Sequence, residues 1–177
     1  MIRILVILAL LSPAGPLLAG DVYQSNEDFL AKVFDGTPPE PGIVWLRDEI
    51  REDSTAIMGH PYPGLRIRYW SRDNRSAWIL EEIGKEKPIT VGLVVNDRRL
   101  ERIKVLAFRE SRGWEVRHPF FTDQFSGVGL AADRRLDRDI DGISGATLSV
   151  RALEKLARLA LYLHDRVHNK DDAQSQK

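Results

Sequence analysis

A short run of small and hydroxyl-bearing residues, DGISGATLS at 141–149, stands directly before the most regular apolar pattern in the chain. From Arg151 to Val167 apolar residues recur at steps of three and four, which is the helical interval. The run therefore leads into a helix start, where backbone N–H groups lack partners and the macrodipole is positive. A phosphate placed there is bound by several donors at once. The pattern predicts an anion or phosphate site, and the alternative is an ordinary capped helix start.

Individual residues of this run have distinct expected roles. Gly145 lets the backbone come close to a ligand, because it carries no side chain. Ser144, Thr147 and Ser149 each offer a hydroxyl group, or cap the helix. The nucleophile elbow of serine hydrolases, G-x-S-x-G, does not fit, since Ala146 stands where its second glycine is needed.

The same run resembles the D-x-x-[ST]-G-A-T-x-[ST] motif of the covalent FMN-binding domain family, through residues Asp141, Gly142, Ser144, Gly145, Ala146, Thr147 and Ser149. Members of that family include peripheral subunits of the sodium-translocating NADH:quinone reductase and of Rnf-type electron-transport complexes. The resemblance implies that a flavin transferase, using FAD, joins covalent FMN through its phosphate to the hydroxyl of Thr147. Asp141 is then expected to accept hydrogen bonds from loop N–H groups, or to bind the magnesium used during attachment.

A second segment, FRESRGW at 108–114, resembles the E-T-x-G-x-G region of the family, which lies against the flavin. Glu110 and Gly113 match that pattern, and Ser111 replaces its threonine. The indole of Trp114 is expected to stack on the flavin, and the alternative is that Trp114 is a core aromatic. Residues 124–127, QFSG, look like the family's Q-F-x-G turn, for which packing is the default explanation. The resemblance covers roughly residues 89–163.

Composition and the N-terminus restrict the possible classes of protein. Residues 1–20 carry an early arginine, a short apolar run and then small residues, which is typical of a cleaved secretory signal peptide. Lys+Arg and Asp+Glu both number 26, so the balance of charge gives no indication of a nucleic-acid partner. The chain has no cysteine, which excludes disulfides and thiolate metal sites. We expect a periplasmic protein whose redox chemistry would depend on a bound cofactor.

The order of the expected elements predicts an α+β domain with a small antiparallel sheet and helices packed on one face. Short helices are expected after Ser25 and from about Val44 to Ile57, and a helical turn at 119–125. Alternating or β-branched segments predict strands at 65–70, 76–80, 89–95 and 100–108. We divide the chain into an N-terminal segment at 21–80, an FMN-binding domain at 81–168 and a disordered polar tail at 169–177.

Three functions agree with these patterns. The first is an exported flavoprotein that carries electrons between a membrane redox protein and a periplasmic acceptor, and so acts as a carrier more than as an enzyme with its own substrate. The second is a non-redox adaptor that binds a membrane protein, and the third is a flavin-dependent reductase of a small acceptor. His164 and His168 are four residues apart on the last helix, but two such ligands do not make a metal site.

Overall fold

The computed structural model describes residues 21–175, so the predicted signal peptide at 1–20 lies outside the described residues. Within them, an open antiparallel sheet of six strands has the order β1-β6-β5-β4-β3-β2. The strands are β1 (Asp21–Val22), β2 (Gly42–Trp45), β3 (Arg66–Arg72), β4 (Arg75–Ile83), β5 (Pro88–Asn96) and β6 (Arg99–Phe108). The helices are α1 (Asn26–Val33), α2 (Asp48–Met58), α3 (Pro119–Thr122) and α4 (Thr147–Ser175), with 3₁₀ turns η1 (Trp114–Arg117) and η2 (Asp123–Phe125). The predicted α+β class is confirmed.

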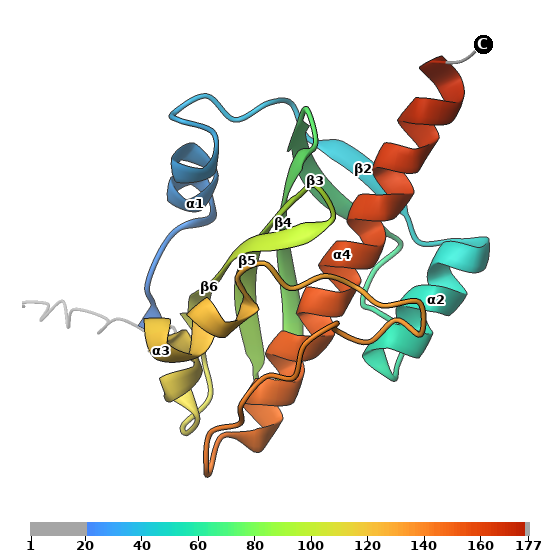
Figure 1. Cartoon of the computed structure of the whole chain (residues 1–177). Helices are drawn as coiled ribbons and strands as arrows, with labels where there is room; N and C mark the ends of the chain where they lie inside the picture. Colours follow the sequence, from blue (N-terminus) through green and yellow to red (C-terminus); the bar gives the residue numbers. More distant parts are fainter. Residues whose placement is uncertain (1–20, 176–177) are drawn as a thin grey trace, which may run out of the picture.

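Helices cover both faces of this sheet (Figure 1). Helices α2 and α4 pack on one face, as expected, in a core that includes Trp78, Leu93 and Leu156. Helix α1 instead packs on the opposite face, through Phe29, Leu30, Val33 and its C-cap Phe34, against Ala77, Val94 and Leu106. The sequence explains this, because strand β5 is an almost continuous apolar run and therefore needs cover on both sides.

The start of α1 was predicted correctly, whereas the start of α2 was not. Ser25 caps α1 by accepting a hydrogen bond of 3.0 Å from the backbone N–H of Asp28. The helix expected from about Val44 begins only at Asp48, because β2 occupies Gly42–Trp45 and pairs with β3. The period of three and four in this segment was therefore misleading, since β-branched and aromatic residues at 43–45 also suit a strand.

Helix α4 spans the sheet and is the longest element in the described part of the chain. Its buried stripe includes Leu153, Leu156, Ala160 and Leu163, as the sequence predicts. The helix continues to Ser175, beyond Asn169, where the polar tail was expected to begin. A helix that is already nucleated by buried turns adds further residues at little cost. No described helix is both long and apolar enough to cross a membrane.

Candidate functional site

The DGISGATLS run forms a tight turn at the start of α4, in the loop at the lower end of this helix in Figure 1. The backbone N–H of Ala146 donates to the carbonyl of Ile143 at 3.0 Å, which closes the turn. Gly145 has a φ of +82°, the left-handed conformation that glycine adopts without a steric cost. The first helical hydrogen bond runs from Val150 N to Ala146 O at 2.9 Å. Ala146 is therefore the N-cap residue, and Thr147 is the first residue of the helix.

An alanine at the N-cap has consequences for the donors of the first turn. It has no side-chain acceptor, so it cannot satisfy the N–H groups of Thr147, Leu148 and Ser149 as serine or aspartate would. Within residues 21–175 no other side chain donates or accepts a hydrogen bond there. These groups point outward at the positive end of the dipole of a long helix, so the expected alternative of an ordinary side-chain cap does not fit this helix start.

The hydroxyl-bearing residues of the run divide into exposed and buried ones. Ser144 and Thr147 are exposed, so their hydroxyl groups are accessible from solvent. Ser149 and Ala146 are buried and face the core. Of the three hydroxyls expected at the site, only those of Ser144 and Thr147 are therefore placed to react with or contact an exogenous phosphate.

The segment that resembles the family's E-T-x-G-x-G region lies against this helix start. Gly113 packs so closely that a Cβ atom there would lie 2.6 Å from Ser149 Oγ and 3.4 Å from Ala146 Cβ. Its φ of +85° also favours glycine. The structure thus brings together two segments that are more than thirty residues apart in the sequence, at the place where the resemblance implies a flavin.

Trp114 lies at the edge of this contact and is 44% exposed, which does not fit the alternative that it is a core aromatic. Its indole meets the ring of His118 edge to face, with the centroids 5.3 Å apart. The guanidinium of Arg117 lies 5.1 Å from the centre of the indole and 4.4 Å from the ring of Tyr23. These contacts fix the indole and leave part of its surface available for stacking.

Glu110 holds a turn of the sheet. Its carboxylate accepts hydrogen bonds from the backbone N–H groups of Lys85, Glu86 and Lys87, in the turn between β4 and β5. Burial raises the pKa of this carboxyl, but the three donors outweigh burial and hold the pKa below its usual value. Glu110 therefore ties the 108–114 segment to the sheet. The positions of Gly113 and Trp114 depend on this link.

Asp141 is held through its backbone, and its side chain is exposed. Its N–H donates to Gln124 Oε1 at 2.7 Å, and Gln124 Nε2 donates to its carbonyl at 3.5 Å. The expectation that the Asp141 carboxylate accepts hydrogen bonds from the loop is not met among the described residues. Gln124 is therefore a residue of the site, whereas packing was the role expected for the QFSG turn at 124–127. In the sequence, only the QFSG turn indicated that Gln124 has a role.

The charged loop between η2 and the DGISGATLS run is anchored at two places. Arg134 Nη1 lies 2.7 Å from the buried carboxylate of Asp53 in α2, which also accepts from Tyr162 Oη at 2.8 Å. Asp137 accepts from the backbone of Gly129 and from Arg99, both at 2.9 Å. This segment is therefore fixed upstream of Thr147 by groups that lie far away in the sequence.

His164 and His168 form a stacked pair, with ring centroids 4.0 Å apart, that links α4 to β3 and β4. His164 Nδ1 and Ser76 Oγ are hydrogen-bonded at 2.7 Å, and Ser76 Oγ accepts from the indole of Trp78 at 2.8 Å. His168 Nε2 lies 3.2 Å from Ser71 Oγ. No described group of three or more His, Cys, Asp or Glu residues is arranged to hold a metal ion.

Comparison with known proteins bears on the segment that contains these features. The family model described as FMN-binding domain matches residues 84–162, from the turn that Glu110 holds to Tyr162 in α4. The match contains both Gly113 and Thr147 and leaves out α1, α2 and strands β1 to β4. No curated protein matches the chain. Residues 84–162 of this chain are therefore similar to the FMN-binding domain family.

Proposed function

We propose that this protein is an exported flavoprotein that holds FMN covalently, through a phosphoester on Thr147, and carries electrons between a membrane redox protein and a periplasmic acceptor. The observation that supports the covalent link most directly is the exposed Thr147 hydroxyl on the first turn of α4, beside backbone donors that have no side-chain cap. The family match supports FMN as the cofactor.

The attachment that the resemblance implies is a transfer from FAD by a separate flavin transferase. The Thr147 oxygen forms a bond to the FMN phosphorus, the pyrophosphate bond of FAD breaks, AMP leaves, and the hydroxyl proton passes to the transferase or to water. The phosphate then lies at the N–H groups of the first helical turn, where the dipole stabilises its charge. Gly145 keeps the approach to Thr147 free of side-chain atoms.

Bound FMN supplies both one-electron and two-electron transfer, so the residues of the chain serve to hold and orient it. Covalent attachment is favourable outside the cytoplasm, because a flavin held only by contacts would be lost by dilution. Trp114, Leu148 and Phe120 are exposed apolar side chains of η1, α4 and α3. A redox partner that covered them would bury apolar surface close to the cofactor.

The test is expression of the exported protein with and without an active flavin transferase. We expect the peptide that contains Thr147 to gain the mass of FMN less water only when the transferase is present. Thr147→Ala should abolish this gain, Thr147→Ser should retain it at least in part, and Ser144→Ala, an exposed hydroxyl in the same turn, should retain it.

Two results would contradict the proposal. One is a chain that stays colourless and unmodified in the presence of the transferase, which would favour the non-redox adaptor. The other is a Thr147→Ala protein that keeps its flavin after denaturation, which would move the link to another residue. Export is tested separately, by sequencing the N-terminus of the protein from the periplasmic fraction, which we expect to begin after Ala19 or Gly20.

A further inference from the structure

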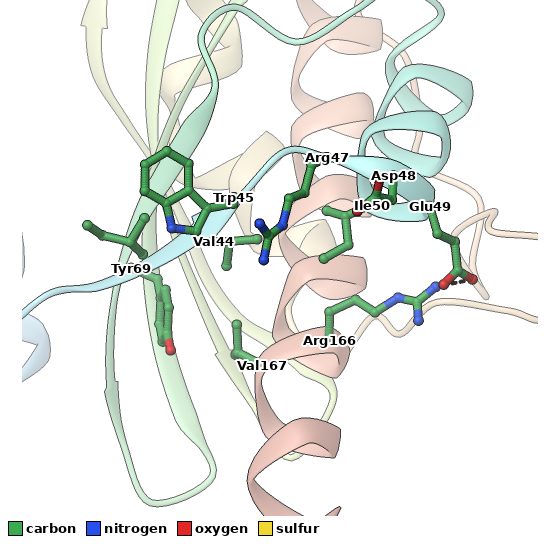
Figure 2. Close-up of a pocket in the computed structure, with 10 residues that line it drawn as sticks. Val44, Trp45, Arg47, Asp48, Glu49, Ile50, Tyr69, Arg166 and Val167 are labelled. Atoms are coloured by element: carbon green, nitrogen blue, oxygen red, sulfur yellow. Dashed lines mark hydrogen bonds and ion pairs between the residues drawn. The ribbon is translucent and has the colours of Figure 1, made fainter.

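A cavity of about 440 Å³ lies between β2, the start of α2 and the C-terminal half of α4, and the flavin site does not explain it (Figure 2). Its apolar wall includes Val44, Ile50, Tyr69 and Val167. Val167 lies twenty residues along α4 from Thr147, which corresponds to roughly 30 Å at the rise of a helix. The cavity is therefore remote from the flavin site, and it is formed largely by elements outside the family match.

The cavity lies beside an open edge of the sheet, because β2 is the terminal strand. Leu46 N donates to Leu65 O at 2.9 Å, and Val44 and Gly42 follow in the same register opposite Ile67 and Tyr69. In an antiparallel ladder, the residues that alternate with these direct their backbone N–H and C=O groups away from the partner strand, which here is β3. Ile43 N–H, Ile43 C=O and Trp45 N–H therefore face the free edge, whereas Trp45 C=O accepts from Arg47 N.

Side chains on this edge are unusually apolar for an exposed strand. Ile43 is 44% exposed and Trp45 is 49% exposed, and β2 contains no lysine or proline that would prevent pairing. An added strand would place the side chain opposite Val44 on the same face as Val44, which is the cavity side. Its two neighbours would point to the other face, beside Ile43 and Trp45.

Three arginines lie near this edge, together with the exposed carboxylate of Asp48 in the cavity lining. Arg47, Arg66 and Arg68 are exposed and have no ion pair within residues 21–175. Figure 2 shows the Arg47 guanidinium beside Val44, whereas Arg166 is engaged by Glu49 at 2.6 Å. Arg66 and Arg68 stand opposite Trp45 and Ile43 in the register, on the face away from the cavity. An acidic side chain on an added strand would meet positive charge there.

We propose that β2 and this cavity bind an extended segment of a partner protein that adds a strand to the sheet and alternates apolar residues with acidic ones. The backbone of the segment pairs with Ile43 and Trp45, its apolar residues enter the cavity, and its acidic residues face the arginines. Strand addition of this kind obtains affinity from main-chain hydrogen bonds and specificity from pockets for alternate side chains. This binding does not depend on the flavin.

The test is a selection of random peptides displayed on phage, with the mature protein as bait. We expect the enriched peptides to alternate apolar and acidic residues. Ile43→Pro removes a donor from the free edge and leaves the β2–β3 bonds intact, so synthetic copies of these peptides should bind it about fivefold more weakly or worse. Arg68→Glu should weaken binding similarly, because Arg68 stands opposite Ile43 on the face that the acidic residues meet, whereas Arg51→Glu, an exposed arginine of α2, should not.

Thermal unfolding of each variant shows whether the fold is retained, and Trp45→Ala provides a second variant that keeps every backbone donor. Trp45→Ala should also weaken binding if the fold is intact. The proposal is overturned if no alternating peptide is enriched, or if enriched peptides bind Ile43→Pro and Arg68→Glu as they bind the unaltered protein. It is also overturned if sedimentation shows a dimer that Ile43→Pro dissociates, because a second copy would then occupy the edge.

Discussion

Gly113 has two independent reasons to be glycine, and a pair of variants separates them. Its φ is +85°, and the space for a Cβ atom is taken by Ser149. Gly127 has a similar φ of +76° but nothing within 4 Å of the corresponding position. Gly127→Ala should therefore lower the free energy of unfolding by about 1 kcal/mol, the cost of a left-handed backbone. Gly113→Ala should lower it by about 1–3 kcal/mol more, because the contact adds overpacking.

Urea denaturation of both variants measures this difference. FMN attachment gives a second readout, since only Gly113→Ala displaces the start of α4 next to Thr147. Equal loss of stability in the two variants would show that Ser149 moves aside at no cost, and that the two segments are not closely packed.

Single residues were predictable where their role is local. Gly145 and Thr147 follow from the turn and helix start that their own neighbours form. The partners of Glu110 and Asp141 lie 17 to 25 residues away, so pattern and spacing did not reveal them. The sequence consequently placed both carboxylates at the cofactor, whereas the structure engages one in a turn and leaves the other exposed.

At the scale of elements, α2 supports the matched segment although it lies outside the family match. Its Asp53 joins Arg134 of the charged loop to Tyr162 and Arg166 of α4. Burial raises the pKa of the Asp53 carboxyl, but these hydrogen bonds and charges outweigh burial and hold the pKa below its usual value. Asp53→Asn should lower the free energy of unfolding by about 1–3 kcal/mol, because it removes the charge from a buried acceptor that binds Tyr162, Arg134 and Arg166.

Hydrogen exchange locates the effect of Asp53→Asn. We expect faster exchange in the loop at 129–140 as well as a lower midpoint in urea. Arg134→Ala should reproduce the change in the loop. Arg135→Ala provides the matched control, because Arg135 pairs only with Asp133 at the surface, and such pairs contribute about 0–1 kcal/mol. A uniform rise in exchange across the protein would refute a specific anchor.

Elements with a strong hydrophobic period were predicted correctly from the sequence. The exception is the segment at 42–58. The buried stripe of α4 and the strands β3 to β6 followed from periods of three to four and of two. The segment at 42–58 contains both a strand and a helix, and its apolar residues Trp45, Leu46, Ile50 and Ile57 also fit one helix. The pairing of β2 with β3 decides the outcome, and that contact is not local.

At the scale of the whole molecule, two histidines change the stability of the fold in different pH ranges. Burial, followed by the charge of His168, lowers the pKa of His164 to about 4, in keeping with its 2% exposure. Hydrogen bonds from His60 to the carboxylate of Glu82 and to Pro61 raise the pKa of His60 above 6.5. Between pH 6.5 and 4 the unfolded chain therefore carries a proton at residue 164 that the folded protein lacks.

Stability should fall as the pH falls through this range, because the unfolded state binds more protons there. For His164 the loss is of the order of 2–3 kcal/mol by pH 4. His60 acts in the opposite sense and at higher pH, since its contribution is fully present below pH 6.5 and is lost as the pH rises through its folded pKa. His164→Gln, which retains an acceptor for Ser76, should flatten the stability profile between pH 6.5 and 4. His60→Gln should lower stability evenly below pH 6.5 and change the slope of the profile only above that pH.

Urea unfolding at a series of pH values from 4 to 8 checks both effects in one experiment. The three carboxyls with lowered pKa, those of Asp53, Glu110 and Asp137, lose their contribution only below their usual pKa values near 4, so they do not obscure the histidine range. If His164→Gln kept the slope of the unaltered protein between pH 6.5 and 4, His164 would have to titrate in the folded state. The Ser76–His164 hydrogen bond could not then hold the imidazole neutral, and the link between α4 and β4 would have to open in mild acid.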